Sequence, residues 1–157
     1  MSKTKIVYTK YYQEDGYSLV VKDSPYGRIY GHAFLNDEDK EIANQWDGCK
    51  IAEMRADLEI QKRRTKKLNH RAIVVDEIVN YILKEFYLYP DRYESVEDVK
   101  VLLDKIWRSA RKQAKDNQEK TARMEESLPA KIDTLLEERH VMREQIEKVR
   151  NMRENKK

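Results

Sequence analysis

Residues suited to acid–base or nucleophilic catalysis are few in this sequence, and they stand far apart. The three histidines, His32, His70 and His140, fall in three different predicted elements, and none has an H-E-x-x-H or H-x-E spacing. No serine lies in a G-x-S-x-G context, and Gly27 and Gly31 are spaced for turns rather than for a phosphate-binding loop. We therefore expect no catalytic residue, no cofactor and no enzymatic activity, since an enzyme would need groups from separate elements to converge.

Metal-binding residue types show no ligand spacing either. Cys49 is the single cysteine, which excludes an intrachain disulfide framework and a cysteine-based zinc finger and is typical of a reducing compartment. The acidic residues Asp37, Glu38, Asp39 and Glu41 could bind a cation, but consecutive acids before a helix more commonly cap its first turn. We expect no metal site.

Charge is abundant and nearly balanced along the chain. The 157 residues include 32 Lys+Arg and 29 Asp+Glu, which leaves a formal net charge of +3. This balance argues against generic coating of nucleic acid and against an acidic mimic of DNA. The sequence has neither a long apolar stretch nor the apolar block of a signal peptide, so we expect a cytoplasmic protein without membrane contact.

Two basic clusters could nevertheless bind phosphates locally. The first spreads around much of a predicted helix, and the second shares one helical face by its i, i+3, i+4, i+7 spacing. Neutralising several phosphates gives salt-sensitive, sequence-independent binding, whereas the alternative for both clusters is a solvated surface. The candidates for contact with nucleic acid or an acidic protein surface are Lys62, Arg63, Arg64, Lys66, Lys67, Arg108, Arg111, Lys112 and Lys115.

Tyrosines are concentrated near the N-terminus, where six of the ten lie within the first 48 residues. They could form an exposed aromatic surface that contacts a protein or stacks on bases. The alternative is that they occupy half-buried strand positions and pack within the fold. The candidates for a partner-binding aromatic surface are Tyr11, Tyr12, Tyr17, Tyr26 and Tyr30.

The first 48 residues are expected to form a small antiparallel sheet that positions these tyrosines. All four glycines lie there, and β-branched and aromatic residues fill the segments between glycine-containing turns. A sheet of this size needs a helix or a partner on at least one face. The predicted strands are 5–12, 17–22 and 28–35.

The remainder of the chain is expected to be helical, because its apolar residues recur at spacings of three and four. No Gly or Pro lies between Gly48 and Pro90, which allows one helix of about 40 residues or two helices with a break near 69–70. In the next helical region the apolar face fades over 111–126, which form a solvated helix or are poorly ordered. Residues 73–107, which are apolar on more than one face, are expected to pack with the inner face of the sheet as the core.

A helix is predicted to restart at 127–129 and to carry a heptad pattern typical of a coiled coil. This seam either folds back on the preceding helix or pairs with a second chain to form a homodimer. Its residues are Leu128, Ile132, Leu135, Met142, Ile146 and Val149. The expected fold is therefore α+β, with three or four helices, at least one of them long. Its segments are a β-meander at 1–48, a helical core at 49–110 and an extended helical tail at 111–157.

One part of the sequence resembles a known pattern. The stretch G-H-A-F-L-N-D-E-D, followed by W-D-G-C-K-I-A-E-M-R-A, is similar to small accessory proteins of phages and mobile elements of Gram-positive bacteria. In those proteins a short sheet ends in an acidic turn, and G-x-x-[IL]-A-x-x-[RK]-A then opens a basic helix. The resemblance covers residues 31–56 and implies an accessory role in phage–host conflict.

Together these observations predict a non-catalytic interaction protein. It would bind and inhibit or regulate a larger macromolecular machine, for example as a phage-encoded inhibitor of a host nuclease or defence complex. Its partner would be a protein or a protein–nucleic-acid complex. The alternative is a nucleic-acid-binding accessory protein that uses its basic helix faces.

Overall fold

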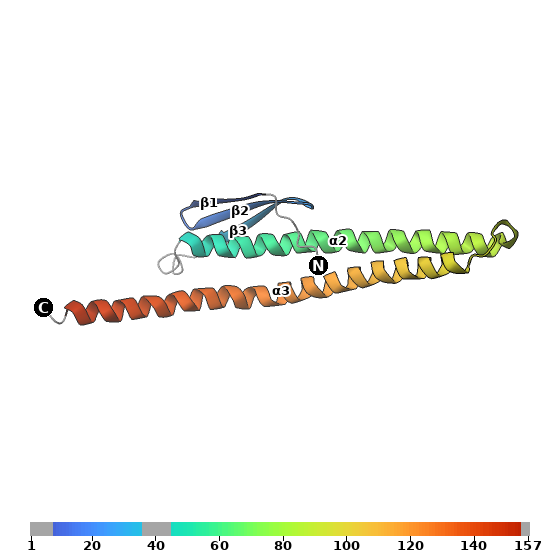
Figure 1. Cartoon of the computed structure of the whole chain (residues 1–157). Coiled ribbons are helices and arrows are strands. Elements are labelled where there is room, and N and C mark those ends of the chain that lie inside the picture. The colour runs from blue at the N-terminus through green and yellow to red at the C-terminus, as the bar shows by residue number, and fades with distance from the viewer. Residues whose placement is uncertain (1–7, 36–44, 155–157) are drawn as a thin grey trace. The chain divides into compact units, whose positions relative to one another are not determined.

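The computed structural model describes residues 8–35 and 45–154 and has the expected α+β fold (Figure 1). Within these residues, one antiparallel sheet is followed by two long helices with a short 3₁₀ helix between them. Neither long helix has the apolar length that crossing a membrane would require. The elements are β1 (Tyr8–Glu14), β2 (Tyr17–Ser24), β3 (Gly27–Phe34), α2 (Gln45–Leu88), the 3₁₀ helix η1 (Pro90–Arg92) and α3 (Glu97–Glu154).

The chain divides into two compact units. Unit 1 comprises Met1–Ile60 and Arg123–Lys157, and unit 2 comprises Gln61–Ala122. Both long helices contribute to both units. The units therefore follow contacts between distant parts of the chain rather than the composition boundaries along it.

The sheet of unit 1 is a meander with strand order β1-β2-β3. Asp15 and Gly16, with φ of 42° and 78°, form a two-residue turn in the left-handed region that suits a β-hairpin. β1 extends to Glu14, two residues beyond its expected end, because Glu14 still pairs with Tyr17 of β2. Residues 5–7 of the expected strand lie outside the described residues.

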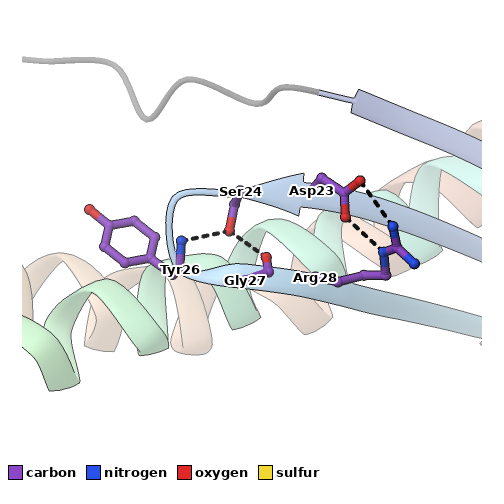
Figure 2. Close-up of polar contacts among 5 residues, drawn as sticks. All are labelled: Asp23, Ser24, Tyr26, Gly27 and Arg28. Atoms are coloured by element: carbon purple, nitrogen blue, oxygen red, sulfur yellow. Dashed lines mark hydrogen bonds and ion pairs between the residues drawn. The ribbon is translucent and has the colours of Figure 1, made fainter.

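Side chains hold the turn between β2 and β3 (Figure 2). The Ser24 hydroxyl donates to the Gly27 carbonyl oxygen at 2.8 Å and accepts from the Tyr26 amide at 3.2 Å. The Arg28 guanidinium donates to both carboxylate oxygens of Asp23, at 2.8 Å from Nε and 3.3 Å from Nη2. This paired hydrogen bond lowers the pKa of Asp23, because it stabilises the ionised carboxylate. The register of the hairpin is thereby fixed at its end.

Small residues allow the sheet to approach α2 closely. Gly48, Ala52 and Ala56 recur every four residues, so they share one face of α2. A Cβ atom on Gly31 of β3 would overlap the Ala52 carbonyl oxygen and lie 2.9 Å from the Ala56 Cβ. A Cβ atom on Gly48 would overlap the Ser18 hydroxyl. The glycine and alanines of the G-x-x-[IL]-A-x-x-[RK]-A pattern therefore have a packing role in this chain.

The main core lies in unit 1, where side chains from β2, β3, α2 and α3 meet. The inner face of the sheet belongs to this core as expected, but the expectation that 73–107 also form it is wrong, because most large apolar side chains of that segment are exposed. Two buried clusters replace it. Val20, Ala33, Ile51 and Ala52 form the first, with Ile132, Leu135 and Leu136 packed against them, and Ile29, Ala56 and Ile60 form the second, with Tyr26 packed against them.

Two buried charged side chains, Lys22 and Asp47, form ion pairs that connect the elements of unit 1. The Lys22 side chain is 3% exposed, and its Nζ lies 2.8 Å from Glu53 Oε1 and 2.6 Å from Asp57 Oδ1 on α2. Burial alone would lower the pKa of Lys22, but hydrogen bonds to Asp57 and Glu53 outweigh it and raise the pKa above 10.5. The fully buried Asp47 carboxylate, in the first turn of α2, lies 2.9 Å from Arg139 Nε of α3.

Unit 2 is an antiparallel helical hairpin built from parts of α2 and α3. α2 is one continuous helix, so the alternative with a break near 69–70 is not adopted. Asn69 accepts a hydrogen bond from Gln118 Nε2 at 3.1 Å, and Trp107 Nε1 donates to Asp76 Oδ1 at 2.6 Å. These contacts align the two helices over most of the unit.

A buried polar layer lies in the same hairpin. Gln61 Nε2 donates to Asn117 Oδ1 at 3.1 Å, and the Thr65 and Thr121 hydroxyls share a hydrogen bond of 2.8 Å. A shift of one helix by a single turn would leave these groups without matched partners. The polar layer therefore fixes the register of the hairpin.

α3 is also one continuous helix, so the expected restart at 127–129 is wrong and 111–126 are helical throughout. Small side chains explain the difference, because Ala110 and Ala114 are buried and fill the seam where large apolar residues were sought. Pro129 lies inside the helix and removes one backbone hydrogen bond. Packing of the following turns against the core of unit 1 outweighs that loss.

Candidate interaction surface

Strand alternation divides the sheet's side chains between two faces. Ser18, Val20 and Lys22 of β2 are buried towards α2, so the intervening residues point to the opposite side, which we call the outer face. Within unit 1, the described segments of α2 and α3 pack on the side of Val20 and Ala33, and none of the described elements of this unit packs on the outer face. By the strand register, the outer face carries Lys10, Tyr12, Glu14, Tyr17, Leu19, Val21, Asp23, Arg28, Tyr30, His32 and Phe34.

Aromatic side chains cluster on the outer face. The Tyr17 ring centroid lies 4.7 Å from that of Phe34 and 5.9 Å from that of His32. The Tyr17 hydroxyl also shares a hydrogen bond of 2.7 Å with His32 Nδ1. Phe34 is 74% exposed, Tyr30 is 52% exposed and Tyr12 is 44% exposed. Exposed rings that neighbouring side chains hold in place are typical of a protein-binding surface.

The outer face is electrically balanced. Its basic residues are Lys10 and Arg28, and its acidic residues are Glu14 and Asp23. Arg28 is paired with Asp23, and Lys10 Nζ lies 4.8 Å from the centroid of the Tyr12 ring. The surface therefore offers rings rather than net positive charge to a partner.

The structure separates the five candidate tyrosines. Tyr12, Tyr17 and Tyr30 share the outer face. The Tyr11 hydroxyl donates instead to Glu53 Oε1 at 3.3 Å on the α2 side, where burial and the Glu53 carboxylate raise the pKa of Tyr11. Tyr26 packs against the second buried cluster.

Sequence reasoning missed two members of the aromatic cluster, His32 and Phe34. The available signal was the alternation of Tyr30, His32 and Phe34 at every second position of β3, which places all three on one face. Only the tyrosines were considered as an aromatic group. The most exposed ring of the surface was therefore overlooked.

Both basic clusters lie in unit 2. They occupy adjacent lengths of the antiparallel hairpin, because Thr65 and Asn69 contact Thr121 and Gln118, whereas Arg111 contacts Asp76. Residues 61–72 and 107–122 together carry eleven basic and two acidic side chains. Binding of nucleic acid or an acidic surface by these clusters stays a prediction.

The heptad residues of the C-terminal seam have different environments. Ile132 and Leu135 pack against the core of unit 1; because α3 is continuous, the seam does not fold back on a preceding helix. Met142, Ile146 and Val149 are exposed. The coiled coil and the dimer through this seam stay predictions.

In the described parts of the chain, the three histidines lie apart from one another and do not form a shared site. His32 belongs to the outer face, His70 lies on α2 in unit 2, and His140 lies on α3 in unit 1. Residues 8–35 and 45–154 contain no group of three or more His, Cys, Asp or Glu side chains placed to hold a metal ion. The acidic run at 37–41 lies outside the described residues.

Comparison of the chain with protein-family models, curated proteins and solved structures found no match.

Proposed function

We propose that this protein is a non-catalytic interaction protein that binds a larger macromolecular machine and inhibits or regulates it. The outer face of the sheet would contact a protein component of that machine. The observation that carries the proposal is the exposed and electrically balanced aromatic cluster around Tyr17, Tyr30 and Phe34. Large rings that lose water on binding are the side chains that most often dominate protein–protein affinity.

The outer face is suited to binding because its rings are held before a partner arrives. The Tyr17–His32 hydrogen bond and the Tyr17–Phe34 contact restrict three side chains. Behind them, Lys22 is held by carboxylates of α2. Restricting side chains in the free protein lowers the entropy lost on association.

Charge favours a protein over a nucleic acid as the partner of this face. A nucleic-acid surface normally presents several unpaired cations to the phosphates. The outer face has equal numbers of acidic and basic side chains. The resemblance of residues 31–56 to phage and mobile-element accessory proteins supports a search among host nucleases and defence complexes.

The test is quantitative affinity purification with the full chain as bait. We expect one protein partner in stoichiometric amount, and we expect the double variant Tyr30→Ser/Phe34→Ser to lose at least about 100-fold in affinity, since two hot-spot rings are removed. The matched control is Met152→Ser, because Met152 is a similarly exposed apolar side chain on α3. Recovery of no stoichiometric partner would refute the function, and equal recovery by both variants would refute the assignment to the outer face.

A second candidate function is nucleic-acid binding by unit 2. The eleven basic and two acidic side chains of residues 61–72 and 107–122 favour it. We expect a variant with Arg63, Arg64, Lys66 and Lys67 changed to Gln to bind more weakly and to lose about four units from the slope of affinity against salt. A salt-titrated gel shift measures both, and no binding by the unaltered chain at about 50 mM salt would refute this candidate.

A further inference from the structure

One side of the helical hairpin in unit 2 is apolar and exposed. Its side chains are spaced by three and four positions on each helix, so each helix contributes one stripe. All are between 37% and 66% exposed, and exposed apolar side chains that lie next to one another are typical of an interaction site. This apolar side consists of Val74, Ile78 and Tyr81 from α2 and Val99, Leu102 and Ile106 from α3.

The two stripes lie on the same side of the hairpin. Arg71, which lies three residues before Val74 and continues the spacing of the α2 stripe, and Ile106 of the α3 stripe both line one pocket of about 240 Å³. The polar contacts of the hairpin are elsewhere around the helices, where Trp107 Nε1 donates to Asp76 Oδ1 at 2.6 Å.

α2 carries two heptad seams that are offset by one residue. The seam towards α3 includes the buried Val79 and the half-buried Val75 and Ile82. The second seam passes through Val74, Ile78 and Tyr81 of the apolar side. Heptad spacing of this kind is what one helix presents to another, so the second seam is suited to a further helix.

Opposite charges stand at the two ends of the second seam. Arg71 and Glu85 continue its spacing, and each lies seven residues from Ile78. The surrounding residues follow the same polarity: at the Arg71 end, residues 61–72 carry six basic and no acidic side chains. Residues 85–98 carry five acidic side chains and one basic side chain. The charge pattern is therefore reversed about Ile78.

We propose that a second copy of this chain covers the apolar side, with the two hairpins antiparallel and a two-fold axis near Ile78. The four helical segments would form a bundle in which the six apolar side chains of one protomer pack against those of the other, with Ile78 nearest its own copy. Arg71 of one protomer would lie within a turn of Glu85 of the other, and the pair would occur twice by symmetry. A parallel arrangement would bring like charges together at both ends, which the reversed pattern disfavours.

Sedimentation of the full chain at tens of micromolar tests the dimer. We expect twice the monomer mass of 18.9 kDa for the unaltered chain and at least about 100-fold weaker association for Ile78→Glu, which would place charges at the centre of the apolar contact. Ile73→Glu is the matched control, because Ile73 is also exposed but lies about 140° around α2 from Ile78. A monomeric unaltered chain, or a dimer that Ile78→Glu leaves intact while circular dichroism shows a folded protein, overturns the proposal.

Charge exchange tests the orientation. Arg71→Glu and Glu85→Arg are each expected to weaken association about tenfold, because each places like charges together twice. The double variant Arg71→Glu/Glu85→Arg restores opposite charges in an antiparallel dimer and is expected to recover the lost affinity. Failure of the double variant to recover association overturns the antiparallel arrangement. This result does not depend on the outer face of the sheet, so it is separate from the proposed function.

Discussion

Replacing Gly31 by alanine is expected to separate the sheet from α2. The new Cβ atom would overlap the Ala52 carbonyl oxygen and lie 2.9 Å from the Ala56 Cβ. Because the obstacle is helix backbone, rotation of a side chain cannot relieve it. The sheet would have to retreat by about 1 Å, and a gap of that size removes a quarter to a half of the dispersion energy across the contact.

The cost follows from what lies behind that contact. Val20, Ile29 and Ala33 are at most 1% exposed, so a retreat of the sheet loosens all three. Overpacking of a core typically costs 1–3 kcal/mol, and a backbone obstacle places this substitution at the upper end, about 3 kcal/mol. Urea unfolding followed by circular dichroism measures the loss, and hydrogen exchange locates it in β2, β3 and the first turns of α2.

Gly48→Ala is the matched comparison at the same contact. Its Cβ atom would overlap the Ser18 hydroxyl, which can rotate away, and alanine in a helix recovers roughly 1 kcal/mol over glycine. We expect the free energy of unfolding to change by less than about 1 kcal/mol. A Gly31→Ala protein as stable as the unaltered chain, or a Gly48→Ala protein that loses as much as Gly31→Ala, would refute the packing argument.

The ion pairs of the buried Lys22 and Asp47 side chains give further predictions. Lys22→Met should lower the free energy of unfolding by about 2–3 kcal/mol at pH 7, because Glu53 and Asp57 lose their shared cation but are partly exposed to water. The stabilising contribution of Lys22 is complete below its ordinary pKa of 10.5 and declines as the pH rises through its raised pKa. The free energies of unfolding of the Lys22→Met variant and the unaltered chain, measured in urea, should therefore converge at alkaline pH. A difference that stays constant with pH would contradict this account. Arg139→Met should lower the free energy of unfolding by about 3 kcal/mol, because it removes the guanidinium beside the fully buried Asp47 carboxylate. The double variant Arg139→Met/Asp47→Asn should recover most of that loss. Equal stability of Arg139→Met and the unaltered chain in urea unfolding would exclude the role given to the pair.

Turn chemistry and helix length were accessible from sequence because single residues determine them. Gly16 required a hairpin turn between the first two strands, and Pro90 limited the helix before it. α2 accordingly ends at Leu88, and the sheet has the expected strand order. At the Gly16 turn and at the end of α2, the conformation that a single residue favours is the one the fold adopts.

The assignment of the tyrosines to faces could not be made from sequence. Lys22 occupies a buried position in β2, so the strand does not show the apolar alternation that would identify its inner face. Its burial depends on Glu53 and Asp57, which lie more than 30 residues further along the chain. Without that contact, Tyr11 and Tyr12 were equivalent candidates.

The continuity of α3 was hidden for a related reason. A helical seam was recognised by large apolar side chains, whereas Ala110 and Ala114 allow close helix packing without them. From sequence alone, the polar residues Gln61 and Asn117 are expected at the surface; they become partners only when the two helices pack together. Such residues acquire a buried role only through tertiary contact.

The division of the chain into units has a consequence for the order of folding. Unit 2 is one continuous segment, whereas unit 1 is assembled from two segments that flank it. Contacts such as those of Ile132 with the cluster around Ile51 join residues about 80 positions apart, so they carry a larger loop-closure entropy than contacts near the hairpin turn. During synthesis the hairpin should form first and bring the C-terminal part of α3 back to the sheet. The platform behind the outer face is then completed only after nearly the whole chain has been made.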